Sequence, residues 1–139
     1  QEQTDAAMHD GWYRSGDLGY RDAEGNVYIV DRVKDMIVTG GENVYSVEVE
    51  RALASHSAIA AAAVIGVPDA HWGERVEAFV TLKPGSEATP DELRQHCREL
   101  IAGYKVPKAV HIEESLPLTA SGKVQKVALR ESVLAEASA

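Results

Sequence analysis

The chain has 139 residues, of which 45% are apolar and 26% charged, and its formal net charge is −8. This length and composition are typical of one soluble globular domain, and the acidic balance excludes the basic surface that nucleic acids or anionic membranes require. The longest apolar stretch, Ile59 to Val67, is too short to span a bilayer. The single cysteine, Cys97, excludes an internal disulfide. Without a signal-peptide pattern, a cytoplasmic location is expected.

The beginning of the chain predicts a polar segment followed by a β-hairpin. Residues 1–10 are polar and start abruptly, so we expect them to be mobile and to continue from a longer protein. Gly11 to Lys34 is typical of a hairpin, because residues 22–26 supply a turn and residues 27–30 are rich in strand formers.

Short elements follow the hairpin. Residues 36–39 predict a strand that ends at Gly40 and Gly41, and Ser46 is expected to cap a short helix through Leu53. The apolar run from Ile59 to Val67 predicts a buried central strand that Pro68 ends. Apolar and polar residues alternate over 75–82, which predicts a half-buried strand.

Residues 89–101 predict a well-defined helix. Thr89 can cap it, Pro90 suits its first turn and Glu92 completes a capping box, while Gly103 ends it. Its apolar face is expected to comprise Leu93, Cys97, Leu100 and Ile101.

The remaining elements are a strand over 109–112, a glycine-containing loop over 118–123 and a final helix with Val127 and Leu134 on nearly the same face. This order predicts an α+β fold. A small, mainly antiparallel sheet is covered by two or three helices and preceded by the β-hairpin.

Histidines and the cysteine give no metal signal. No two of the five histidines have ligand spacing and only one cysteine is present, so we expect no protein-bound metal. The histidines are His9, His56, His71, His96 and His111. A Ser–His–Asp triad stays open, although the Gly-x-Ser-x-Gly elbow is absent.

Three segments are stranger than folding alone requires. In the segment Tyr13 to Gly19, two glycines flank an acidic residue. In Asp31 to Asn43, a group of charged residues is followed directly by a strand and two glycines. In Pro117 to Lys123, a lysine lies on a loop. Each alone is equally compatible with a turn, a solvated charge cluster or the approach to a helix.

Together, and in this order, the three segments resemble the last signature regions of the adenylate-forming superfamily of acyl-CoA synthetases, peptide adenylation domains and luciferases. The resemblance extends from Gly11 to Leu134. Residues 39–50 are most similar to fatty-acyl and related acyl-CoA ligases. The Arg-Gly-x-Arg pattern of peptide adenylation domains is absent there, and Val38 stands where coumarate ligases and luciferases carry a lysine.

The resemblance implies an ATP-dependent, AMP-forming ligase. A carboxylate attacks the α-phosphate of ATP to give acyl-adenylate and pyrophosphate, and the thiol of coenzyme A then displaces AMP. By resemblance, Lys123 is the catalytic cation, Asp17 and Arg32 bind the nucleotide, and Lys34 is the hinge between two poses of the carboxy-terminal domain. A mobile cation near the α-phosphate suits the charge that develops there.

The resemblance also implies a coenzyme A site. Two glycines line the pantetheine tunnel beside a glutamate, and two aromatic residues and a lysine lie where some relatives contact the nucleotide end; these residues are Gly40, Gly41, Glu42, Trp72, Tyr104 and Lys108. Val106 replaces an arginine that some relatives use.

The family's phosphate-binding loop and acyl pocket have no counterpart in this sequence. We therefore expect residues 1–31 to be the end of a large amino-terminal domain and residues 32–139 to be the mobile carboxy-terminal domain. The expected partners are a carboxylic acid, most simply a fatty acid, ATP with Mg²⁺ held outside this chain, coenzyme A and the missing domain. The isolated chain should fold without activating acids. An adenylating domain that loads a carrier protein and a non-catalytic binding module are the alternatives.

Overall fold

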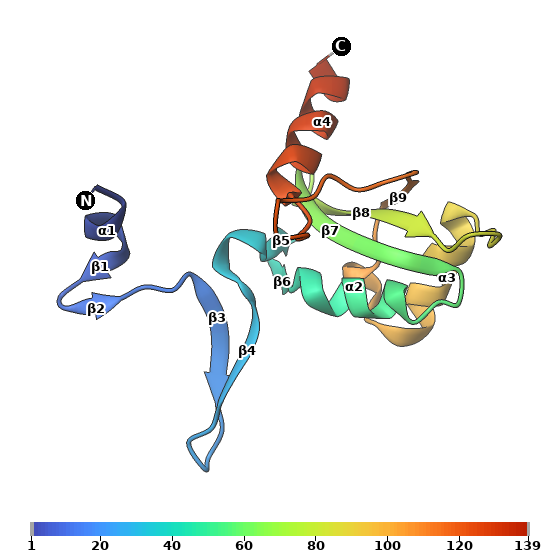
Figure 1. The fold of residues 1–139 in the computed structure, drawn as a ribbon. Coiled ribbons are helices and arrows are strands. Elements are labelled where there is room, and N and C mark those ends of the chain that lie inside the picture. Colours follow the sequence, from blue (N-terminus) through green and yellow to red (C-terminus); the bar gives the residue numbers. More distant parts are fainter. Residues whose placement is uncertain (1, 139) are drawn as a thin grey trace.

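A five-stranded sheet with helices on both faces organises the computed structural model, which describes residues 2–138 (Figure 1). The sheet order is β6-β5-β8-β7, and β9 lies parallel to β8 while the other neighbours are antiparallel. The strands are β5 (Ile37–Thr39), β6 (Glu42–Val44), β7 (Ile59–Asp69), β8 (Gly73–Leu82) and β9 (Ala109–Ile112). The expected α+β fold with a small, mainly antiparallel sheet is confirmed.

Helices cover both faces of this sheet. Figure 1 shows α2 (Ser46–Ala54) and α3 (Pro90–Leu100) on one face and α4 (Lys126–Ser138) on the other. Two short 3₁₀ helices, η1 (Val33–Asp35) and η2 (Gly103–Lys105), lie in the connections. No helix within residues 2–138 is both long and apolar enough to cross a bilayer.

The beginning of the chain extends away from the sheet (Figure 1). It comprises α1 (Glu2–Ala7), β1 (Met8–His9), β2 (Trp12–Tyr13), β3 (Asp17–Arg21) and β4 (Val27–Arg32). The predicted hairpin is confirmed as β3–β4, whose turn is fixed by the Asn26 N–H donating to Asp22 Oδ1 at 2.8 Å. It begins at Asp17, however, because the residues just before it pair in the separate β1–β2 hairpin. The mobility of residues 1–10 stays a prediction, and residue 1 lies outside the described residues.

Strand β7 is an edge strand, so the prediction of a central strand was wrong. Within the described residues it pairs only with β8, from Ile59 opposite Leu82 to Asp69 opposite Gly73. Its apolar run is continuous because helices cover both of its faces: Val64 packs in the cluster with α2 and α3, and Ile65 in the cluster with α4. Pro68 does not end the strand, since an edge strand tolerates proline.

Strand β8 is the buried centre of the sheet, which corrects the expectation of a half-buried strand. Val76 and Val80 pack toward α2 and α3. Phe79 packs on the other face with Leu129 and Val133 of α4. In β8 the alternating residues therefore point to two faces that are both buried, and neither face is exposed to solvent.

Three local predictions about the helices also need correction. The final helix buries Leu129 and Val133, whereas Val127 and Leu134 are exposed. In α3, Leu93 and Cys97 are fully buried and Leu100 is exposed. The apolar periodicity identified the helices correctly. It did not show which residues at the edge of an apolar face are buried against the sheet and which are exposed to solvent.

The third correction concerns the start of α2. Tyr45 is its N-cap residue, and Ser46 is the first helical residue. The Ser46 hydroxyl makes no cap and instead donates to Asp31 Oδ2 at 2.9 Å. Strand β6, just before this helix, was not predicted, because its residues Glu42 and Asn43 are poor strand formers.

The capping box of α3 gives a stability prediction. The Thr89 Oγ1 accepts from the Glu92 N–H at 3.3 Å, while the Glu92 carboxylate accepts from the Thr89 N–H at 2.7 Å. Thr89→Ala should lower the free energy of unfolding by about 1 kcal/mol in urea denaturation. Thr89→Ser keeps the acceptor and should retain most of the stability. Equal losses in both variants would contradict the role of the hydroxyl.

Candidate functional site

Asp17 and Arg32 lie side by side where β3 and β4 meet the body of the molecule. The two residues face each other in the strand register, and Arg32 Nε lies 3.2 Å from Asp17 Oδ1. Both side chains are partly exposed. The structure thus brings together the two residues predicted to bind the nucleotide. A carboxylate beside a guanidinium offers acceptors and donors to one polar ligand.

Lys34 lies directly after this pair, in η1. Its side chain is exposed, whereas the neighbouring Asp35 is buried. Arg130 of α4 binds this turn, with Nη2 at 3.3 Å from Asp35 Oδ1 and 3.5 Å from the Lys34 carbonyl oxygen. An exposed lysine on a short turn is compatible with the predicted hinge, and the fold itself does not test the motion.

Lys123 ends a tightly hydrogen-bonded loop before α4. The Lys123 N–H donates to Thr119 Oγ1 at 3.1 Å, the Thr119 N–H donates to the Lys123 carbonyl at 2.7 Å, and Gly122 adopts a positive φ of 83°. The backbone at Lys123 is therefore held, while its side chain is exposed and makes no hydrogen bond or ion pair to any residue from 2 to 138.

A cavity of about 360 Å³ joins the Lys34 turn to this loop. It is lined by Lys34, Asp35, Thr119, Val124, Gln125, Lys126 and Val127. Two segments about ninety residues apart in sequence therefore share one concave surface, whose charged lining residues are Lys34, Asp35 and Lys126.

A second cavity, also of about 360 Å³, gathers five of the six residues predicted for coenzyme A. It is lined by Thr39, Gly40, Glu42, Trp72, Gly103, Tyr104 and Lys108. The Lys108 Nζ lies 5.5 Å from the centroid of the Trp72 ring, within range of a cation–π contact. The cavity therefore combines aromatic surface with a cation, which suits a ligand that has both a flat ring and phosphates.

Gly40 and Gly41 form the turn between β5 and β6 at the rim of this cavity. Their φ angles are 58° and 84°, a conformation that glycine adopts without strain. The Gly40 N–H donates to the Trp72 carbonyl oxygen at 2.8 Å, and a Cβ on Gly40 would lie 3.0 Å from the Trp72 ring. Gly41 does not line the cavity, and a Cβ there would meet nothing within 4 Å. Gly40 is thus needed for both packing and backbone conformation, and Gly41 for backbone conformation alone.

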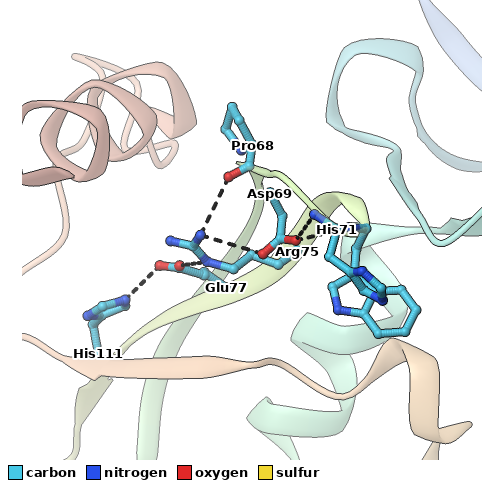
Figure 2. Close-up of polar contacts among 7 residues, drawn as sticks. Pro68, Asp69, His71, Arg75, Glu77 and His111 are labelled. Carbon is cyan, nitrogen blue, oxygen red and sulfur yellow. Dashed lines mark hydrogen bonds and ion pairs between the residues drawn. The ribbon is translucent and has the colours of Figure 1, made fainter. Parts of the chain in front are cut away.

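Asp69 fixes the turn that presents Trp72. Its Oδ1 accepts from the backbone N–H groups of His71 and Trp72, both at 2.9 Å. These bonds, the one from Trp72 foremost, lower the pKa of the Asp69 carboxyl. Figure 2 shows the continuation of this network to Arg75, whose Nη1 lies 3.8 Å from Asp69 Oδ2 and 3.4 Å from the Pro68 carbonyl oxygen.

The network ends on a buried carboxylate. Glu77 is 2% exposed, and its oxygens meet Arg75 Nε at 2.6 Å and His111 Nε2 at 2.8 Å (Figure 2). The His111 ring also stacks on Phe79 with centroids 4.5 Å apart. A buried charge of this kind must be paired, and here the pairing fixes Arg75 behind the Trp72 turn.

Sequence reasoning missed Thr39, Gly103, Asp69 and Arg75. The pattern Pro-Asp-x-x-x-Gly between two strands is a turn signal that could have identified Asp69. Cys97 offers no nucleophile, because burial raises the pKa of its thiol to about 11.

Comparisons with known proteins agree on one family. The family model described as the AMP-binding enzyme C-terminal domain matches residues 48–123. A long-chain-fatty-acid–CoA ligase of Bacillus subtilis (strain 168) is 50% identical over 130 residues, which cover 94% of this chain and 23% of the relative. A feruloyl-CoA synthase of an Amycolatopsis species is 47% identical over 129 residues, 93% of this chain and 26% of the relative.

A solved structure gives the same result. The crystal structure of ATP-bound MatB from Rhodopseudomonas palustris matches with a TM-score of 0.86 and 38% identity, covering 94% of this chain and 26% of that one. The chain thus spans about a quarter of the length of the relatives it matches.

The Trp72 turn gives a prediction for a Trp12→Phe background, in which Trp72 is the single tryptophan. Asp69→Ala should increase acrylamide quenching of Trp72, because two backbone N–H groups lose their acceptor. Since the pKa of Asp69 is lowered, the ordering is complete above the carboxyl's ordinary pKa and is lost as the pH falls through the lowered value. Asp91→Ala, which removes a carboxylate that is 93% exposed, is the control. Unchanged quenching in Asp69→Ala would contradict the role of this carboxylate.

Proposed function

Because the chain belongs to the AMP-binding enzyme family and carries the C-terminal domain of its members, we propose that it is part of an AMP-forming acid–thiol ligase. The whole protein joins a carboxylic acid to coenzyme A at the expense of ATP. The observation that carries this proposal is the cavity that unites Gly40, Glu42, Trp72, Tyr104 and Lys108. Its aromatic and cationic lining fits the nucleotide end of coenzyme A, and its glycine turn fits the approach of a thin pantetheine arm.

Asp17 and Arg32 act in the first half-reaction. The Asp17 carboxylate accepts hydrogen bonds from the ribose hydroxyls of ATP, and the adjacent guanidinium donates to ribose and phosphate oxygens. Their 3.2 Å contact holds both groups ready for a single ligand. The substrate carboxylate attacks the α-phosphorus, a new P–O bond forms, and pyrophosphate leaves with the electrons of the broken P–O bond.

Lys123 supplies positive charge during this step. Its ammonium group is exposed on a loop whose backbone is fixed by Thr119, so it can reach a ligand without unfolding the loop. A cation that meets the oxygens of the α-phosphate stabilises the charge that develops there. In the second half-reaction, the coenzyme A thiol gives up its proton, attacks the acyl carbon, and AMP leaves.

The rest of the active site belongs to a preceding domain of the same protein. Apolar side chains of residues 12–29 are strongly exposed, among them Trp12 (78%), Val27 (68%) and Ile29 (64%), which fits burial against that domain. Residues 1–31 then end the large domain, and residues 32–139 form a lid that turns about Lys34 between the two half-reactions. Within residues 2–138 no cluster of three acidic, histidine or cysteine side chains could hold Mg²⁺, so we assign that ion to the preceding domain.

We propose that the carboxylic acid substrate is a fatty acid. A long-chain-fatty-acid–CoA ligase is among the relatives with the highest identity, whereas other relatives are named for feruloyl and 2-succinylbenzoate substrates. The acyl pocket lies outside this chain. A cytoplasmic location fits an enzyme that uses the acid, ATP and coenzyme A.

The proposal predicts the effect of Lys123→Ala in the full-length protein. Acid-dependent exchange of pyrophosphate into ATP should fall roughly a hundred- to a thousandfold, as when one charge-stabilising donor is lost. Lys83→Ala removes another exposed lysine and should leave the exchange unchanged. The isolated chain should fold and show no exchange.

A panel of fatty, aromatic and dicarboxylic acids, with and without coenzyme A, identifies the substrate class in the same assay. Thioester formed with coenzyme A supports the ligase, whereas adenylate that reacts only with a carrier protein supports the carrier-loading alternative. A folded full-length protein that exchanges no pyrophosphate with any acid of the panel would contradict adenylation of these acids and would leave two alternatives, an acid of another class or the binding module.

A further inference from the structure

A polar cluster is buried where β4, α2 and α4 meet, between the two proposed nucleotide-binding segments. Ser46 is 0% and Asp31 is 6% exposed. Lys126 of α4, whose side chain is 15% exposed, lies with its Nζ 2.8 Å from Ser46 Oγ and 2.7 Å from Glu50 Oε1. The Ser46 Oγ in turn lies 2.9 Å from Asp31 Oδ2. We call these four residues the Ser46 relay.

The direction of each hydrogen bond in the Ser46 relay is fixed by chemistry. An ammonium group can only donate and a carboxylate can only accept. The Ser46 hydroxyl therefore accepts from Lys126 and donates its proton to Asp31. The other oxygen of Asp31 accepts from the backbone N–H of Arg32 at 2.8 Å. A continuous line of hydrogen bonds thus runs from Lys126, three residues after Lys123, to the backbone of Arg32.

A second contact holds the same two segments together one turn farther along α4. Arg130 meets Asp35, which is 8% exposed, and the carbonyl oxygen of Lys34. The start of α4 is therefore attached on both sides of the turn that contains Lys34. The cavity between Lys34 and Thr119 is bounded by these attachments.

The burial of the cluster makes each member depend on the others. The Ser46 relay contains two carboxylates, Asp31 and Glu50, and one ammonium group, that of Lys126. Lys126 contacts Glu50 directly, and Asp31 is stabilised by the hydrogen bond that it accepts from the Ser46 hydroxyl. Without that hydroxyl, Asp31 keeps the Arg32 backbone donor and loses its hydrogen-bonded link to Lys126 through Ser46. A buried carboxylate that loses a donor is destabilised and moves toward water.

We propose that Ser46 and Lys126 are positioning residues that hold the Lys123 loop in register with Arg32 while the substrate carboxylate attacks the α-phosphorus and pyrophosphate leaves. This inference rests on the proposed function, in which Lys123 and Arg32 meet the same nucleotide. The Ser46 relay does not touch the substrate and acts through the loop and through the Arg32 backbone. It should therefore matter for adenylation and not for the attack of the thiol.

The test compares substitutions of two serines in the full-length protein, Ser46 at the start of α2 and Ser55 directly after its end. Ser46→Ala should slow acid-dependent pyrophosphate exchange roughly ten- to a hundredfold, the range expected when a hydrogen bond to a charged group is lost. Thioester formation from supplied acyl-adenylate and coenzyme A should change less than about twofold. Ser55→Ala removes a hydroxyl that lies 2.7 Å from the Ala52 carbonyl oxygen and 2.8 Å from His96 Nε2, with no contact to the Ser46 relay, and should change neither rate.

Substitutions at Lys126 separate charge from packing. Lys126→Met keeps most of the volume and should reproduce the loss of exchange, whereas Lys126→Arg keeps the donors and should restore most of it. Equal losses in both half-reactions, or a Ser46→Ala variant that exchanges pyrophosphate at the wild-type rate, would overturn the inference.

A structural measurement tests the role of the Ser46 relay even if the wild-type protein activates none of the acids tested. Such inactivity would count against the proposed function alone. Ser46→Ala and Lys126→Met should speed tryptic cleavage after Lys123 and amide exchange over residues 118–124, because the base of the loop is released. Ser55→Ala should leave both rates unchanged. Cleavage and exchange that match the wild type in all variants would show that the Ser46 relay does not order the loop.

Discussion

The antiparallel pairing of β7 with β8 is the interaction on which the rest of the molecule depends. One face of this pair presents Val64 and Val76 to α2 and α3, and the other presents Ile65 and Phe79 to α4. The connection between the two strands carries Trp72, so the ladder that organises the core also sets one wall of the proposed coenzyme A cavity. A shift of register by one residue would exchange the two faces and move this wall.

The sequence predicted the elements of the fold better than their environment. Whether a segment forms a helix, a strand or a turn depends on residues close together in sequence, such as the capping box at Thr89 and the turn at Asp22. Whether a strand is central or an edge depends on partners that are distant in sequence. The run from Ile59 to Val67 would look the same in either place, because α2 and α4 bury residues 63–67 of this edge strand, although Ala60 and Ala61 are exposed.

The same division holds for the site. Gly40 and Lys123 belong to motifs that can be read locally, and five of the six residues assigned to coenzyme A by resemblance do line one cavity. Ser46 was instead expected to cap its own helix. Its real partners, Asp31 and Lys126, are 15 and 80 residues away, and the second of these contacts requires the whole fold. A buried serine at a helix start gives no local sign of which use its hydroxyl serves.

Glu50 has a consequence beyond the Ser46 relay. Its Oε1 also accepts the backbone N–H of Val64 at 3.0 Å, near the middle of the outer edge of β7. An open strand edge can pair with the same strand of another molecule and so begin aggregation. Here a side chain already occupies the donor that such pairing would use. The carboxylate that anchors Lys126 therefore also blocks one backbone donor of this edge and makes its pairing with another molecule less favourable.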